Sequence, residues 1–156
     1  MQQKFYLEYQ KEGYYKITSM YSKKSLTAKD GKITDGNSIV QYDYQELDSQ
    51  KWILRDTHIN GWIISSFVNP ELSLSIHGNI ENGSKLVLSK TVNSEKQMLY
   101  TYRVSKEEKP KENGIYNMAI GSNSSKTLEV IGAGIEENTI VDIWNYRKWN
   151  ATEILF

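Results

Sequence analysis

Cysteine is absent from the 156 residues of the chain. A disulfide scaffold, a zinc site built on thiolates and a cysteine nucleophile are therefore excluded. Only two histidines occur, His58 and His77, and they stand in neither an HxxxH nor an HExxH spacing. The sequence therefore predicts no metal site.

No sign of charge dominates, because 19 basic residues face 19 acidic ones. This balance weighs against nucleic-acid binding and against binding to a membrane surface. The longest apolar run, 62–68, is interrupted by two serines and is too short to span a bilayer. The chain also lacks a G-x-S-x-G elbow and any nucleophile–base set, so we expect neither catalysis nor a cofactor.

Turn signals are frequent and lie between short β-prone segments. Glycine follows Asp or Asn at Asp30-Gly31, Asp35-Gly36 and Asn82-Gly83, as tight hairpins require. Segments rich in Ile, Val, Tyr, Thr and Leu predict strands at 14–18, 38–44, 62–65, 72–76, 85–89, 98–104 and 139–144. No window carries a capped helical stripe, so the sequence predicts an all-β fold.

A unit of about 50 residues occurs three times. Each copy opens with glycine and an aromatic-aliphatic segment, at 13–17, 61–65 and 114–118. A leucine follows after 13, 13 and 14 residues, and the copies close at 50–52, 97–99 and 152–154. Three repeats of four short strands would hide their edges by closing into a barrel. We expect two inner layers on the threefold axis, Leu26/Leu74/Leu128 and Trp52/Leu99/Ile154.

The first copy reads G-x-Y-x-I, S-x-x-x-L, D-G-N-x-I-V-Q-Y and Q-x-W in order. This pattern resembles the ricin B-type β-trefoil lectins, most closely their bacterial branch. The resemblance covers residues 13–156, with repeats at about 13–55, 61–104 and 113–156, and implies a β-trefoil with pseudo-threefold symmetry. It also implies that Trp52 packs inward and that Gln50 holds the preceding loop. Only the first Q-x-W triplet is intact.

Residues 1–12 lie outside these repeats as an N-terminal leader. Their segment FYLEY alternates apolar and polar residues, as an edge strand does. Either Phe5, Tyr6 and Tyr9 are exposed and pack on a partner, or the leader packs against its own barrel.

The family resemblance also implies where sugars bind. Family lectins place an acid after the repeat leucine, an aromatic plate fifteen residues later, a polar residue three further on, and an asparagine before the Q-x-W glutamine. In the first repeat these positions hold Thr27, Tyr42, Gln45 and Ser49, with Asp30 nearby as a substitute acid. Tyr42 is also explained as a structural residue, and Asp30 as a turn residue.

In the third repeat the same positions hold Glu129, Trp144, Arg147 and Ala151, so acid and plate are both present. The second repeat has Ser75, Ser89 and Val92 there, with neither acid nor plate. The set Glu129/Trp144/Arg147 is therefore the leading candidate site. The alternatives are that Trp144 covers the core, that Glu129 is a solvated surface acid, and that Arg147 pairs with Glu129.

The resemblance implies a non-catalytic lectin for galactose- or N-acetylgalactosamine-type glycans, within a bacterial toxin or haemagglutinin assembly. Such a component would be secreted, although the N-terminal residues lack the apolar stretch of a signal peptide. The alternative function is a protein–protein adaptor, favoured by the degenerate Q-x-W triplets and the abundant aromatic residues. A further possibility is a binding domain attached to an enzyme.

Overall fold

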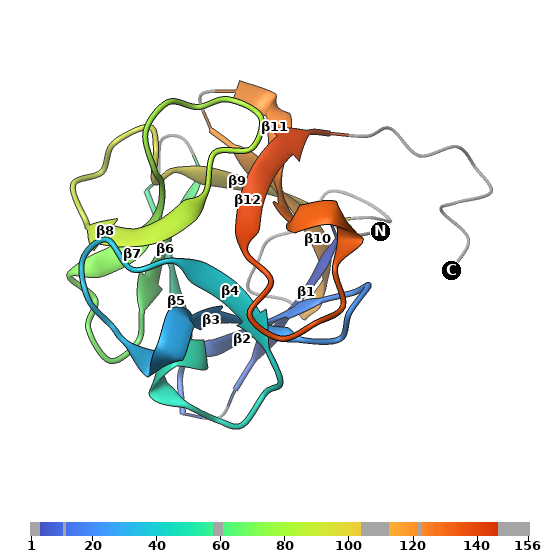
Figure 1. Ribbon diagram of the computed structural model, residues 1–156. Helices are drawn as coiled ribbons and strands as arrows, with labels where there is room; N and C mark the ends of the chain where they lie inside the picture. Colours follow the sequence, from blue (N-terminus) through green and yellow to red (C-terminus); the bar gives the residue numbers. More distant parts are fainter. Residues whose placement is uncertain (1–3, 11, 58–60, 104–112, 122, 147–156) are drawn as a thin grey trace.

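The computed structural model describes residues 4–10, 12–57, 61–103, 113–121 and 123–146 (Figure 1). Its strands are β1 (Phe5–Tyr9), β2 (Tyr15–Ser19), β3 (Ser25–Ala28), β4 (Ile39–Tyr42), β5 (Trp52–Asp56), β6 (Trp62–Ser66), β7 (Leu72–Ile76), β8 (Leu86–Lys90), β9 (Leu99–Arg103), β10 (Gly114–Ile120), β11 (Asn123–Val130) and β12 (Val141–Asn145). Three short 3₁₀ turns accompany them: η1 (Lys29–Gly31), η2 (Asp48–Gln50) and η3 (Ile131–Ala133). The all-β prediction is confirmed. Across these ranges no helix is long and apolar enough to cross a membrane.

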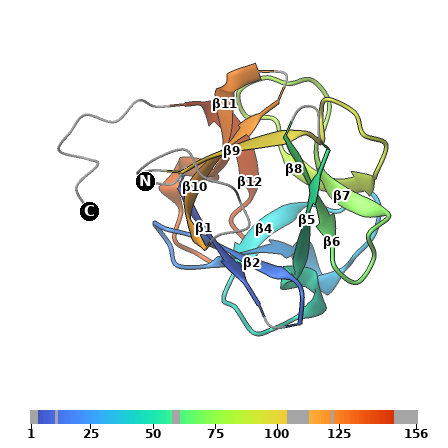
Figure 2. The same ribbon diagram turned by 180° about the vertical axis from the view of Figure 1, so that it is seen from behind.

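Six strands close into a barrel, in the cyclic order β1, β2, β5, β6, β9 and β10. Every neighbouring pair is antiparallel, and the ring leaves none of these strands as an open edge. Figure 2 shows β1 lying between β10 and β2.

Three hairpins, β3–β4, β7–β8 and β11–β12, cover one end of this barrel. They occupy three sectors around the centre of the molecule (Figure 1). Isolated bridges join each hairpin to the next, at Ser38–Val87, Lys85–Asp142 and Val40–Ile140. The predicted β-trefoil is therefore confirmed.

The first expected inner layer is present. Leu26, Leu74 and Leu128 are all buried, each on the second strand of its repeat. Trp52 is buried as well, and its indole Nε1–H donates to the Leu26 carbonyl at 3.1 Å. The inward-packing role expected for Trp52 is therefore confirmed, and its only polar atom is satisfied.

The third repeat is completed by the first strand of the chain. Equivalent residue pairs join the fourth strand of each repeat to the first: Trp52 with Tyr15, Leu99 with Trp62, and Phe5 with Tyr116. Phe5 is fully buried, as Trp52 and Leu99 are. The register therefore assigns β1 to the third repeat, whereas the sequence analysis placed residues 1–12 outside all three.

The inner position expected for Ile154 is occupied by Phe5, and Ile154 lies outside the described residues. The sequence explains the fit, because residues 3–5 read Gln-Lys-Phe where residues 50–52 read Gln-Lys-Trp. Of the two alternatives for the leader, the structure has the one in which it packs on its own barrel. Tyr9, at the end of β1, remains exposed.

Candidate functional site: a pocket on the first repeat

Four residues expected at the first-repeat site line one pocket of about 290 Å³: Thr27, Asp30, Tyr42 and Gln45. They come from β3, η1, β4 and the loop that follows β4. Ser49 lines the same pocket, and Asn138 joins it from the third repeat. Strand pairing and turns thus bring together side chains that are far apart in the sequence.

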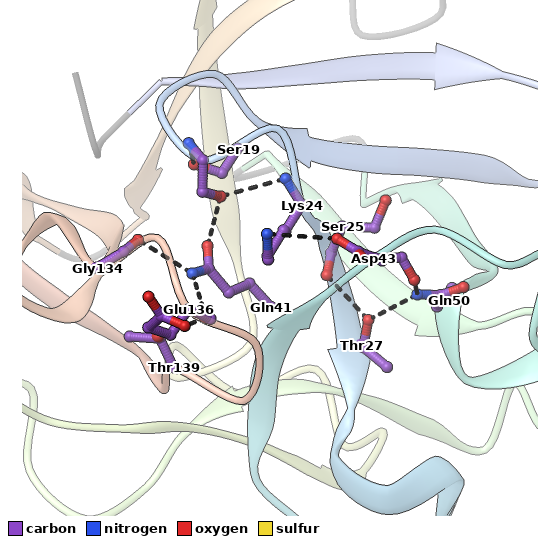
Figure 3. A network of polar contacts seen from close by, with 11 residues as sticks. Ser19, Lys24, Ser25, Thr27, Gln41, Asp43, Gln50, Gly134, Glu136 and Thr139 are labelled. Atoms are coloured by element: carbon purple, nitrogen blue, oxygen red, sulfur yellow. Dashed lines mark hydrogen bonds and ion pairs between the residues drawn. The ribbon is translucent and has the colours of Figure 1, made fainter.

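Gln50 fixes the loop that carries Gln45. Its amide Nε2 donates to the Asp43 carbonyl at 2.8 Å (Figure 3), and its Oε1 accepts from the Gln45 backbone N–H at 2.9 Å. In the second repeat Gln97 makes the same pair of bonds to Lys90 and Val92. The loop-holding role expected for Gln50 is confirmed, and it keeps this side of the pocket rigid.

Thr27, at the position of the family acid, is buried and bonded inward. Its Oγ1 donates to the Ser25 carbonyl at 2.9 Å and accepts from Gln50 Nε2 at 3.2 Å (Figure 3). Both bonds belong to the scaffold, so the carboxylate in this pocket comes from Asp30.

Asp30 occupies a backbone position that favours glycine. Its φ is +56°, and the equivalent residues in the other repeats are Gly78 at +74° and Gly132 at +61°. The equivalence follows from the preceding residues, because Lys29, His77 and Ile131 each donate a backbone N–H across their own hairpin. A side chain in the left-handed region costs free energy relative to glycine, so the turn alone does not explain an aspartate here.

Tyr42 is partly exposed and is held by a residue of the third repeat. The Glu137 carboxylate, through its charge and a hydrogen bond from the phenol, raises the pKa of Tyr42. The ring therefore has a fixed partner on its outer edge and borders the pocket. Ser49 lies deeper: its Oγ is buried, and among the described residues it has no hydrogen-bond partner.

The third-repeat candidate has a different geometry. Glu129 and Asp142 are cross-strand neighbours and only 3% and 4% exposed. Burial, followed by the charge of Glu129 and a hydrogen bond to it, raises the pKa of Asp142 to about 7. Asp142 therefore keeps its proton up to near neutral pH while it is hydrogen-bonded to Glu129. Asp142 Oδ1 is also buried and finds no hydrogen-bond partner in the part of the chain that the structure describes.

Trp144 is 37% exposed, and its ring lies close to Gly83. It faces Thr127 across the hairpin, one residue pair beyond Leu128 and Ile143. Arg147, the third member of this set, lies outside the described residues. The alternative that Glu129 is a solvated surface acid is wrong, because Glu129 is buried and lies opposite Asp142.

At the second repeat Ser75 is buried and Val92 exposed, and neither is an acid or an aromatic plate. Sequence reasoning missed three residues near the other two sites: Asp142, Glu137 and Asn138. Asp142 was detectable, because it stands opposite Glu129 once the β11–β12 register is drawn. Asn138 lines the first pocket and Glu137 bonds to Tyr42, both from another repeat, and spacing within a single repeat carries no signal for that.

Comparison with known proteins gives the same architecture. A designed threefold-symmetric protein, ThreeFoil, superposes with a TM-score of 0.74 at 16% identity, covering 92% of this chain and 90% of that one. A ricin B-like lectin from Macrolepiota procera, solved with lactose, gives 0.67 at 20% identity, covering 90% and 91%. The C-half of an earthworm R-type lectin, solved with GalNAc, gives 0.60 at 15% identity, covering 93% and 90%.

A search of curated proteins found no significant sequence match. The family and the two natural neighbours are lectins, and the comparisons indicate no enzymatic family. The family model for the ricin-type β-trefoil lectin domain-like family matches residues 1–89, more than half of the sequence, and the chain belongs to this family.

Proposed function

We propose that this domain binds galactose- or N-acetylgalactosamine-type glycans in the first-repeat pocket. The observation that carries the proposal is the convergence of Asp30, Tyr42 and Gln45 on one pocket, with Asp30 at a position that glycine occupies in the other repeats. A pyranose needs an aromatic face for its C–H groups and polar acceptors for its hydroxyls. Tyr42 provides the first, and Asp30 provides a carboxylate acceptor.

A further group suits the same ligand. Gln45 lies on a loop that Gln50 holds rigid, so its amide is placed before a ligand arrives. A single shallow pocket makes few contacts, so affinity for a monosaccharide is in the millimolar range, roughly −4 kcal/mol.

Weak single sites become useful through avidity, when several copies act on one surface. We therefore propose that the domain works within a secreted multi-subunit assembly, such as a bacterial toxin or haemagglutinin. The lactose and GalNAc complexes of the lectin neighbours support the ligand class and do not bear on the assembly.

The test is a titration of the ¹⁵N-labelled protein with lactose and with GalNAc, followed by NMR. The wild type should shift backbone signals of residues 27–31 and 42–50. Tyr42→Ala should lose binding while keeping a folded spectrum, and Trp144→Ala, the matched aromatic control on the third repeat, should bind as the wild type does. Loss of binding in Trp144→Ala alone would instead move the site to Glu129/Trp144/Arg147, and no binding by the wild type would overturn the proposal.

One observation favours the adaptor as a second candidate function. An aromatic hollow of about 430 Å³ lies at the barrel wall and is lined by Tyr9, Gly13, Tyr15, Ile53, Leu54 and Trp62. Tyr9 is exposed at this hollow, and aromatic side chains are enriched at protein interfaces. Size-exclusion chromatography of the wild type and of Tyr9→Ser, each mixed with the proteins encoded beside this one, tests the adaptor function. Co-elution that Tyr9→Ser abolishes supports it, and separate elution of the wild type contradicts it.

A further inference from the structure

The first-repeat pocket is not built by the first repeat alone. Asn138, from the loop between η3 and β12, lines the pocket beside Tyr42. The preceding residue, Glu137, accepts a hydrogen bond from the Tyr42 phenol. The Asn138 backbone N–H donates to the Gln41 carbonyl at 2.8 Å, and Gln41 donates back to the Thr139 carbonyl at 3.0 Å. The third-repeat loop therefore forms one wall of the pocket.

Gln41 holds this wall with its side chain as well. Its buried amide Nε2 donates to the carbonyls of Gly134 at 3.0 Å and Glu136 at 2.7 Å, and its Oε1 accepts from Ser22 Oγ at 2.6 Å (Figure 3). The equivalent residues at the other two junctions are Leu88 and Ile143, identified by the same reciprocal backbone bonds. Neither has a polar side chain, so within the described residues this side-chain anchor is found at the Gln41 junction and not at the other two.

Asn138 also has a left-handed backbone conformation. Its φ is +66°, and the equivalent positions in the other repeats are Gly36 and Gly83, both at +88°. Asparagine tolerates this region better than most residues, but glycine suits it best. Asp30 and Asn138 are therefore two polar side chains at left-handed positions, and both line the same pocket.

The pocket holds more than a plain hexose requires. Beyond the Tyr42 ring and the Asp30 carboxylate it has the Asn138 amide and the side chain of Leu47, which is 40% exposed. An acetamido substituent carries an amide that pairs with an amide and a methyl group that packs on an aliphatic side chain. Asn138 and Leu47 supply these two kinds of contact in the pocket.

We propose that Asn138, positioned by Gln41, makes the first-repeat pocket select N-acetylated hexosamines over the corresponding plain hexoses. This inference rests on the proposed sugar-binding function and deepens it by naming the substituent that is recognised. Asn138 contacts the acetamido group, Leu47 packs on its methyl, and Gln41 is a positioning residue that keeps the Asn138 loop against the pocket.

The experiment measures dissociation constants for GalNAc and galactose by NMR titration of three proteins: wild type, Asn138→Gly and Gln41→Leu. Asn138→Gly copies Gly36 and Gly83, so it keeps the backbone unstrained, and Gln41→Leu copies Leu88. The wild type should bind GalNAc roughly 3–10-fold more tightly than galactose, the range of one net hydrogen bond. In Asn138→Gly this ratio should fall to about one.

Gln41→Leu should lower the ratio as well, and the NMR signals of residues 134–139 should broaden or shift, which a change in global stability alone would not produce. A wild-type ratio of about one, or an unchanged ratio in Asn138→Gly, would overturn the inference and leave the proposed function standing. Failure of the wild type to bind either sugar would overturn both.

Discussion

The first and third repeats have matching strands and turns at their candidate sites, but they differ in where their acidic side chains lie. Equivalent positions of the first and third repeats hold Thr27 and Glu129, Val40 and Asp142, Asp30 and Gly132, Tyr42 and Trp144, and Asn138 and Gly83. In the third repeat the acids lie on the strands, buried and paired with each other. In the first repeat the acid lies on the turn, exposed at the edge of a pocket.

The comparison teaches that an acid at the family position can be buried and paired rather than open to a ligand. Glu129 has the right spacing to Trp144, but it is buried and hydrogen-bonded to a protonated Asp142 inside the protein. Thr27 is not an acid, yet the first repeat has a carboxylate on Asp30, three residues further along the chain. Exposure and partners, rather than spacing, separate the two sites.

The largest expected effect on stability comes from placing the equivalent of Asp142, without its partner acid, in the first repeat. Val40 is fully buried and stands opposite Thr27, so Val40→Asp would bury a carboxylate with no acid to share a proton. We expect a loss of about 3–5 kcal/mol of unfolding free energy, or a Tm lower by roughly 6–20 °C. Thermal unfolding followed by circular dichroism measures this.

The control is Val40→Thr, which adds a polar group of the same shape without charge. The double variant Thr27→Glu/Val40→Asp rebuilds the third-repeat pair and should recover part of the loss. Equal Tm values for Val40→Asp and Val40→Thr would contradict the view that pairing with Glu129 is what makes Asp142 tolerable.

Much of the scaffold was predictable from the sequence, because each copy repeats its landmarks within itself. Leu26, Leu74 and Leu128 recur at nearly constant distance from the opening glycine, and all three are buried. Gln50 and Trp52 follow from the triplet that they form. These features depend on local spacing, which a repeat alignment detects directly.

The place of β1 in the third repeat was not predicted, because it depends on pairing between β1, near the N-terminus, and β10. Phe5 pairs with Tyr116, more than a hundred residues away, and only the copy of Gln-Lys-Trp at residues 3–5 hints at it. The pocket was predicted in part: Thr27, Asp30, Tyr42 and Gln45 meet, but Asn138 enters from the neighbouring repeat. Contacts between repeats have no fixed spacing within a repeat.

An intermediate effect is expected from the pH dependence of the third-repeat pair. The pKa of Asp142 is raised from 3.8 to about 7, so the folded protein holds a proton that the unfolded chain releases near pH 4. The contribution of Asp142 to stability is therefore present at low pH and is lost as the pH rises toward 7. Asp142→Asn removes this loss and should be more stable than the wild type at pH 8 by about 1–3 kcal/mol.

The measurement is the Tm difference between Asp142→Asn and the wild type from pH 4 to pH 8. The difference should grow with pH in favour of the variant, and Asp35→Asn, a change at an exposed aspartate, should show no such trend. A difference that is constant across this range would mean that Asp142 does not hold a proton in the folded protein.

The smallest effect on stability, and the most direct exchange between the two sites, is expected at the left-handed turn positions. Gly132→Asp puts the first-repeat aspartate on the third repeat, where φ is +61°, and should cost about 1 kcal/mol. Asp30→Gly makes the reverse change and should raise stability by up to the same amount, while the pocket loses its carboxylate. Chemical denaturation resolves both changes, and NMR titration with GalNAc reports the function. If Asp30→Gly is more stable and no longer binds, the aspartate is kept for its ligand at a cost to the fold. If it is more stable and binds as before, the carboxylate has no part in the site, and Tyr42 and Asn138 alone distinguish the first repeat from the third.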